Sequence, residues 1–183
     1  MSSILSRRTM TGAYRIGDQM ADNPKEHEFE IILEAIGRSV GKMRSEITVS
    51  RPGSSETYEM ATDEGDFHGG DGTAPPPLSY FATAFTACLM TQIRAFSKRL
   101  DIPINGVVVK GHYRWIGRQT GRDPYVGSPG GFSFDIDVDS DASTEDLVKL
   151  IEAAKKGCFI DQTMAVANDV GHRLKVGDDW LEV

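Results

Sequence analysis

A long apolar helix is the feature that most constrains this fold. Residues 75–77 are three prolines, and the run that follows them has apolar residues at helical spacing until Ile102-Pro103. We therefore expect a helix over residues 79–100. One stripe of this helix should face protein and not bulk water. It consists of Phe81, Phe85, Cys88, Gln92 and Phe96.

The segments around this helix predict an α+β fold. Residues 45–50 and 57–62 have a period of two and flank a turn with Pro and Gly, which indicates a β-hairpin. Residues 104–117 and 131–139 indicate a second hairpin with a long connection over residues 117–131. Helices starting near Ser143 and Cys158 and a last strand over residues 172–183 follow. Strands and helices that are grouped in this way are typical of α+β folds.

The N-terminal region is predicted to be an arm followed by a helix. Residues 1–22 are polar and have no clear period. Asn23-Pro24 with Glu26 resembles a helix start, and Phe29, Ile32, Leu33 and Ile36 then lie on one stripe that ends at Gly37. We expect an arm and helix over residues 1–40 and a main domain over residues 41–183.

Charge and composition narrow the possible partners. The net charge of −7 and the pI near 5.1 argue against a nucleic-acid or anionic-membrane surface, because both need clustered Lys and Arg. No run approaches the roughly 18 apolar residues of a membrane helix, and no signal peptide is visible, so we expect a cytoplasmic protein. The four histidines are scattered, and no metal or cofactor is expected. Small molecules or further copies of the chain remain as partners.

The two cysteines, Cys88 and Cys158, are 70 residues apart. A reducing compartment disfavours a structural disulfide, so they are either buried apolar residues or reactive ones. Cys158 follows Gly157 at a helix junction beside Lys155 and Lys156, and both features favour a thiolate. Cys88 has no such help within its own helix, so an Arg brought by the fold would have to activate it. The residues alone leave both interpretations open.

Taken together, several segments resemble the OsmC/Ohr family of osmotically inducible and organic hydroperoxide resistance proteins. They are the glycine-rich DEGDFHGGDGTAPPPL, the ACL around Cys88 and the AAKKGCFIDQTM around Cys158, and the similarity covers residues 45–183. The resemblance implies an OsmC-like fold of two intertwined subunits, with long central helices packed by sheets and thiol sites at the dimer interface. It also implies that Cys88 attacks an organic hydroperoxide and Cys158 resolves the product. An external dithiol, and no bound cofactor, would then reduce the disulfide.

One position departs from the family's peroxidases. They carry a Glu ten residues before the first cysteine, where it orients an activating Arg, and this chain has Leu78 there. Arg51 is the nearest candidate for that Arg, and Arg44 is the alternative. Two functions are therefore weighed: a peroxidase with Cys88, Cys158 and Arg51, or a non-catalytic dimer that binds a small apolar ligand or senses redox state.

Overall fold

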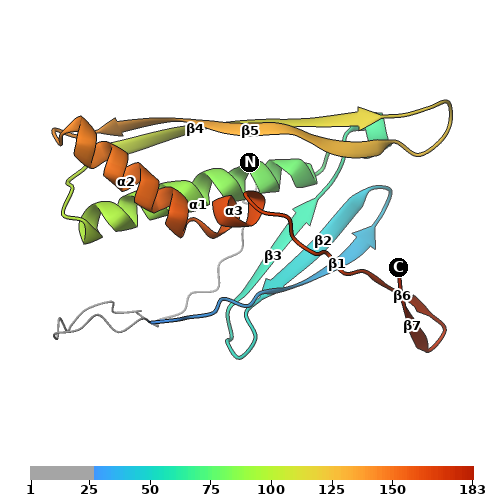
Figure 1. Ribbon diagram of the computed structural model, residues 1–183. Coiled ribbons are helices and arrows are strands. Elements are labelled where there is room, and N and C mark those ends of the chain that lie inside the picture. Colours follow the sequence, from blue (N-terminus) through green and yellow to red (C-terminus); the bar gives the residue numbers. More distant parts are fainter. Residues whose placement is uncertain (1–26) are drawn as a thin grey trace. The chain divides into compact units, whose positions relative to one another are not determined.

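The computed structural model describes residues 27–183, which form two compact units (Figure 1). One unit ends at Tyr80 and the other spans Phe81–Val183, and each is described by itself. The predicted arm over residues 1–22 and the predicted helix start at residues 23–26 lie outside the described residues. The domain boundary expected at residue 40 stays a prediction.

The first unit is built on a three-stranded antiparallel sheet in the order β1-β2-β3. Its strands are β1 (Glu34–Val40), β2 (Arg44–Ser50) and β3 (Thr57–Thr62). The hairpin predicted from the period of two is therefore confirmed as β2 and β3.

The helix predicted to end at Gly37 is wrong over its described part. Residues 27–33 have no regular structure, and β1 follows them. β1 pairs with β2 along its whole length, from Glu34 opposite Ser50 to Val40 opposite Arg44. Pairing with a neighbouring strand decided the conformation here, because the local helical pattern is a weak preference that tertiary contacts override.

The glycine-rich segment after β3 folds back on itself. It contains the short 3₁₀-helix η1 (Asp66–His68), and Gly70 N–H donates to the Gly65 carbonyl at 3.1 Å. Gly70 has to be glycine, since a Cβ there would lie 1.9 Å from the Glu64 carbonyl oxygen. Asp63 N–H donates to the Pro75 carbonyl at 3.3 Å, which closes the loop.

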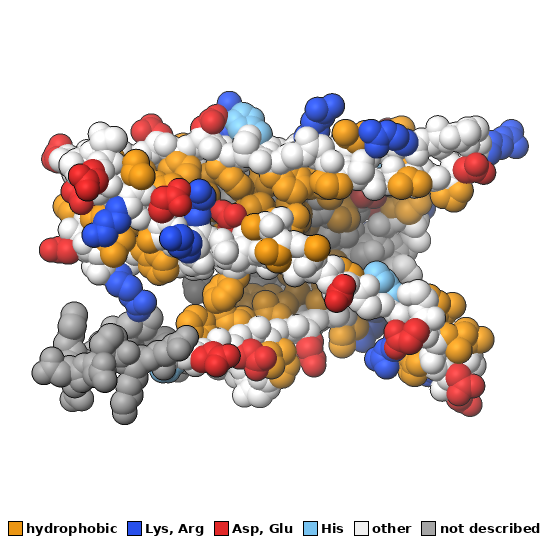
Figure 2. All heavy atoms as spheres, in the orientation of Figure 1, with side chains coloured by type: hydrophobic (Ala, Val, Ile, Leu, Met, Phe, Trp, Pro, Cys, Tyr) orange, Lys and Arg blue, Asp and Glu red, His pale blue; other side chains and the backbone are white. Residues whose placement is uncertain are grey.

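The second unit packs helices against a long β-ribbon. Helix α1 (Pro77–Arg99), most of which belongs to this unit, and α2 (Thr144–Gly157) lie along one face of the antiparallel pair β4 (Gly106–Arg118) and β5 (Val126–Asp139) (Figure 1). Hydrophobic side chains gather on this side of the ribbon (Figure 2). The buried core comprises Phe85, Leu89, Ile93, Ile102, Leu150, Ala154 and Cys158. The prediction of a long helix over residues 79–100 is thus confirmed, and so is the α+β class.

Tyr113 joins the ribbon to α1. Its hydroxyl lies 2.8 Å from Thr86 Oγ1 and donates to the Ala82 carbonyl at 3.1 Å. A Cβ at Gly111 would lie 2.5 Å from the Tyr113 ring, so the missing side chain two residues earlier makes room for it.

The ribbon is longer than the sequence predicted. The connection covers only residues 119–125, and β5 begins at Val126, so it includes Pro129. Arg114 pairs with Gly131 and Trp115 with Pro129, which leaves Gly130 as the extra residue of a bulge. A proline is tolerated there because this strand has a neighbour on one side only.

The C-terminal part contains a short helix and a hairpin. Helix α3 (Phe159–Met164) begins directly after Cys158. The single last strand that we predicted is instead β6 (Arg173–Val176) and β7 (Asp179–Glu182), because Gly177 adopts a positive φ of 63° and turns the chain back. None of the helices in the described part of the chain is long and apolar enough to cross a membrane.

Candidate functional site

The structure brings Cys88 and Cys158 together within the second unit. Their Sγ atoms lie 3.2 Å apart, and both thiols are free. Cys158 is completely buried, whereas Cys88 is half-buried on the α1 stripe. A disulfide has an S–S distance of about 2.05 Å, so the two sulfurs need to approach by only about 1.1 Å to form the bond.

Gly157 allows this approach of α2 to α1. A Cβ on Gly157 would lie 2.5 Å from two ring atoms of Phe96 and 3.5 Å from Gln92 Oε1. Phe96 and Gln92 both belong to the stripe on which Cys88 lies. Because Gly157 has no side chain, the end of α2 can touch this stripe and place the next residue, Cys158, against Cys88.

Helix α3 holds the Cys158 side chain from the other side. Cys158 is the N-cap residue of α3, and its Sγ accepts a weak hydrogen bond from Asp161 N–H at 3.5 Å. Gln162 Nε2 donates to the Lys155 carbonyl at 2.9 Å and so ties α3 to the end of α2. The junction between the two helices therefore fixes the position of the sulfur.

The pKa of Cys158 is raised from 9.0 to about 11, chiefly by burial of the thiol. The backbone N–H of Asp161 acts in the opposite direction, and the neighbouring Cys88 raises the pKa further. Cys158 is therefore a neutral thiol at pH 7, and its S–H group donates to Cys88 Sγ.

Our expectation that the helix junction and two lysines make Cys158 a thiolate is wrong. Lys155 Nζ forms an ion pair with Glu152 at 2.9 Å on the surface, and no basic side chain is among the groups that shift the Cys158 pKa. Desolvation of the charged form outweighs the two N–H groups at the start of α3. Sequence spacing could not show this, since the burial arises from α1.

The two candidate arginines belong to the first unit. Arg51 is exposed in the turn between β2 and β3, where its backbone bonds Glu56 and Ser54. Arg44 begins β2, and its guanidinium Nη1 donates to Thr73 Oγ1 at 3.0 Å. Thr73 in turn bonds the buried Asp63. The contact between Asp63 and Thr73 was not expected, because a loop of this composition gives no signal of it.

Leu78 lies in the first turn of α1 and is 52% exposed. That turn contains no acidic residue. The position at which the resemblance led us to look for a carboxylate thus carries an apolar side chain that is half-exposed to solvent.

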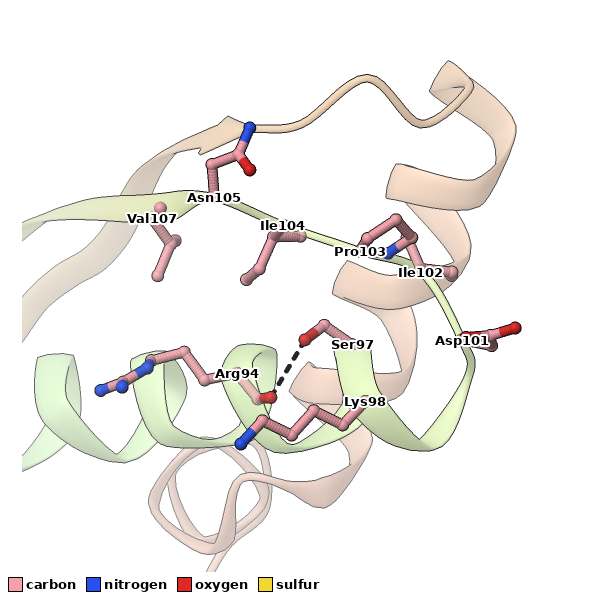
Figure 3. Close-up of a pocket in the computed structure, with 10 residues that line it drawn as sticks. Arg94, Ser97, Lys98, Asp101, Ile102, Pro103, Ile104, Asn105 and Val107 are labelled. Atoms are coloured by element: carbon pink, nitrogen blue, oxygen red, sulfur yellow. Dashed lines mark hydrogen bonds between the residues drawn. The ribbon is translucent and has the colours of Figure 1, made fainter.

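A pocket of about 430 Å³ in the second unit lies where α1 ends and the chain leads into β4 (Figure 3). Arg94 and Lys98 line it from the helix, and Asn105 lines it from the segment before β4. Neither cysteine lines this pocket, so it is separate from the pair of thiols. Within residues 27–183, no three His, Cys, Asp or Glu side chains are grouped so that they could hold a metal ion.

The chain is similar to known proteins in sequence and in fold. A family model described as OsmC-like protein matches residues 70–173, a range that includes both cysteines. The crystal structure of an OsmC-like hydroperoxide resistance protein from Jannaschia sp. CCS1 is 41% identical, with 82% of this chain and 96% of that chain covered and a TM-score of 0.58. An OsmC-like protein from Mycoplasma pneumoniae is 13% identical, with 76% and 89% covered and a TM-score of 0.50, and it shows the fold alone. A search of curated proteins found no match.

Proposed function

The chain belongs to the OsmC-like protein family, and on this premise we propose that it is a thiol-dependent peroxidase for organic hydroperoxides. The observation that carries the proposal is the 3.2 Å separation of the Cys88 and Cys158 sulfurs. The relative from Jannaschia, which is 41% identical, is described as a hydroperoxide resistance protein, and this supports the same substrate class.

The reaction takes three balanced steps. The Cys88 thiolate attacks the terminal oxygen of ROOH, the O–O bond breaks, and the products are Cys88–SOH and, after proton uptake, ROH. Cys158 then attacks the Cys88 sulfur, its thiol proton leaves with the hydroxyl group as water, and a disulfide forms. An external dithiol reduces the disulfide to two thiols and is itself oxidised to a disulfide.

The difference in burial between the two sulfurs supports this division of roles. Cys88 is half-buried and can meet a substrate, whereas Cys158 is fully buried and neutral at pH 7. A neutral thiol is a poor nucleophile toward peroxide in bulk solution, but it lies directly beside the atom on which the sulfenic acid forms. Cys88 is therefore the attacking residue and Cys158 the resolving one.

A guanidinium completes the proposed site by stabilising the Cys88 thiolate. Arg51 is the candidate that the sequence favours, and Arg44 is the alternative. An opposite charge within about 4–6 Å lowers the pKa of an acid, which is the effect required here.

We also propose that the protein acts as a homodimer. Within one chain, Phe85, Leu89 and Ile93 of α1 are at most 3% exposed, so this part of the helix does not call for a partner. Apolar side chains are exposed elsewhere, above all on the β6–β7 hairpin, where Leu174, Val176, Trp180 and Leu181 are each at least 50% exposed. A hairpin of this kind needs a partner surface. Sedimentation showing a monomer at all concentrations would exclude the dimer.

Rapid mixing of the reduced protein with cumene hydroperoxide tests the peroxidase proposal. We expect two thiols to be lost for each peroxide consumed in the wild type. The Cys158→Ser variant should stop at a sulfenic acid, and the Cys88→Ser variant should not react. Slow oxidation of the wild type at the rate of a free thiol would refute the proposal.

Leu78 favours an alternative function, in which the protein is a non-catalytic dimer that binds a small apolar ligand or senses redox state. The absence of a carboxylate in the first turn of α1 is the observation in its favour. This alternative predicts unreactive thiols in the same experiment, together with saturable binding of an apolar dye that protects Cys88 from alkylation.

A further inference from the structure

We propose that the pocket at the end of α1 is a binding site for an aliphatic carboxylate. The carboxylate group lies on Arg94 and Lys98, and the hydrocarbon chain lies against Ile104 and Val107. The pocket has a volume of about 430 Å³, which is within the range of small-molecule sites, roughly 300–1,000 Å³, and it lies wholly within the second unit. Neither cysteine lines it, so this site goes beyond the proposed peroxidase reaction and does not depend on it.

The space exists because the core stripe of α1 ends in a small residue. Phe85, Leu89 and Ile93 follow one another at a spacing of four residues and are buried in the core. The next residue at this spacing is Ser97, which is also buried, and its hydroxyl donates to the Arg94 carbonyl at 3.0 Å (Figure 3). A serine whose hydroxyl is turned back onto its own helix leaves room that a larger side chain would fill.

The turn after α1 places the other wall of the pocket opposite Ser97. Asp101 has a positive φ of 54°, a left-handed conformation that ends many helices, and Ile102 N–H donates to the Ser97 carbonyl at 2.9 Å. Three residues later, Asn105 N–H donates to the Asp139 carbonyl of β5 at 2.7 Å. The wall is therefore tied to α1 at one end and to β5 at the other, and the pocket is fixed by the fold.

The inside of this wall is apolar. The side chains of Ile104 and Val107 point toward α1 in Figure 3. Both residues are half-buried, so part of their apolar surface is still open to solvent. Covering such surface with a hydrocarbon chain is favourable, because it removes apolar area from water. A short alkyl chain is therefore the chemical group that fits here.

Two cationic side chains lie at the edge of this apolar space. Arg94 and Lys98 are about one turn apart on α1, and their charged ends both point back along the helix in Figure 3. Within residues 27–183, neither of them forms an ion pair. Asp101 also lines the pocket, but its carboxylate points the opposite way (Figure 3). An anion at this edge therefore meets two positive charges that no carboxylate of the described chain neutralises.

The negative end of the helix dipole acts against an anion here, but it is the weaker effect. It amounts to about half a unit charge and falls off within the last turn of the helix. Arg94 lies more than one turn before the end of α1 at Arg99, and the Ser97 carbonyl is already hydrogen-bonded to Ile102. Two full positive charges exceed this effect. A guanidinium binds a planar carboxylate through two parallel N–H donors, so a carboxylate suits the pair.

An NMR titration of the whole protein with sodium hexanoate tests the site. We expect saturable shifts of the amide signals of residues 104–107, with a Kd of about 1 mM, as is usual for so small a ligand. Acetate lacks the hydrocarbon chain and should bind at least about tenfold more weakly. Hexanol lacks the charge and should also bind about tenfold more weakly. Inorganic phosphate, which has no apolar part, should give no saturable shift.

Variants that remove single charges show which side chains hold the carboxylate. Arg94→Gln and Lys98→Gln should each raise the Kd of hexanoate by up to about fivefold, because each removes one exposed charge. Arg99→Gln removes a charge from the next position of α1, which does not line the pocket, and is the matched control. Cys88→Ser should bind hexanoate as the wild type does, because the thiols are not part of the pocket.

Several results would overturn this proposal. Equal affinity for hexanol and hexanoate would leave the two cations without a role, and equal affinity for acetate would do the same for the apolar wall. The same weakening in Arg99→Gln as in Arg94→Gln would show a general attraction of anions to a basic helix end. Shifts that disappear in Cys88→Ser would place the ligand at the thiols, and the absence of any saturable shift would refute the site outright. None of these readouts uses a peroxide, so they are independent of the outcome for the proposed function.

Discussion

The substitution Gly157→Ala tests whether close packing of α2 on α1 is what brings the two cysteines together. An alanine Cβ at this position would lie 2.5 Å from two atoms of the Phe96 ring, where ordinary contacts are about 3.5–4.0 Å. About 1 Å of relief is needed, so either the ring turns away or the end of α2 moves outward. If α2 moves, it takes Cys158 with it.

The expected size of two effects, the loss of stability and the slower formation of the disulfide, can be worked out from the structure. Alanine in a helix is favoured over glycine by about 1 kcal/mol, and an overpacked core loses about 1–3 kcal/mol. The net loss of stability should be about 0–2 kcal/mol. The sulfurs, 3.2 Å apart, need about 1.1 Å of approach to bond, and an outward shift of about 1 Å would roughly double this distance. We therefore expect a clear decrease in the rate of disulfide formation together with a small loss of stability.

Oxidation of the reduced protein by diamide, followed by a thiol count, measures this rate without any peroxide. The variant Gly157→Ala with Phe96→Leu should recover much of it, because the smaller side chain makes room. Gly171→Ala is the matched control, since a Cβ there meets nothing within 4 Å. Wild-type rates and an unchanged thermal midpoint in Gly157→Ala would show that the missing side chain does not set the sulfur distance.

Three further predictions concern single groups. The pKa of the Cys158 thiol is higher in the folded protein than in the unfolded chain. The folded protein therefore keeps the thiol proton to a higher pH. Its contribution to the free energy of unfolding is fully present below about pH 9 and is lost as the pH rises to about 11. Urea titrations should show about 2–3 kcal/mol of this loss in the wild type and not in Cys158→Ala. Tyr113→Phe removes the hydroxyl bonded to Thr86 and Ala82 and should cost about 1 kcal/mol in thermal unfolding. Leu78→Glu places a negative charge in the exposed first turn of α1, so the free energy of unfolding should stay the same or rise by up to about 1 kcal/mol. Peroxide oxidation should become faster only if the new carboxylate reaches the activating arginine.

The elements that could be predicted from the sequence are those whose signals are local. The start of α2 is one example, since Ser143 Oγ accepts from Asp146 N–H at 3.1 Å as the cap pattern predicts. Helix α1 is another, because its apolar spacing continues over more than five turns. In each case the residues that determine the structure are neighbours along the chain.

The features that the sequence could not give depend on contacts between distant segments. The helical spacing of Phe29, Ile32 and Ile36 was outweighed by the pairing of β1 with β2. The Cys158 pKa depends on burial under α1, which outweighs the local features that we had taken to decide it. Arg44 and Thr73 are 29 residues apart, and only the folded loop places them together.

In the reaction that we propose, one fold gives the same side chain two chemical roles. Both cysteines need to lie close together for a disulfide, yet the attacking one must ionise and the resolving one must not react with the substrate itself. Burial separates them, because it keeps Cys158 protonated and out of reach while Cys88 remains half-exposed. The same burial makes a cation at Cys158 unnecessary and concentrates the need for one on Cys88. The first turn of α1 supplies no carboxylate to hold such a cation, so in the proposed reaction another group has to hold it.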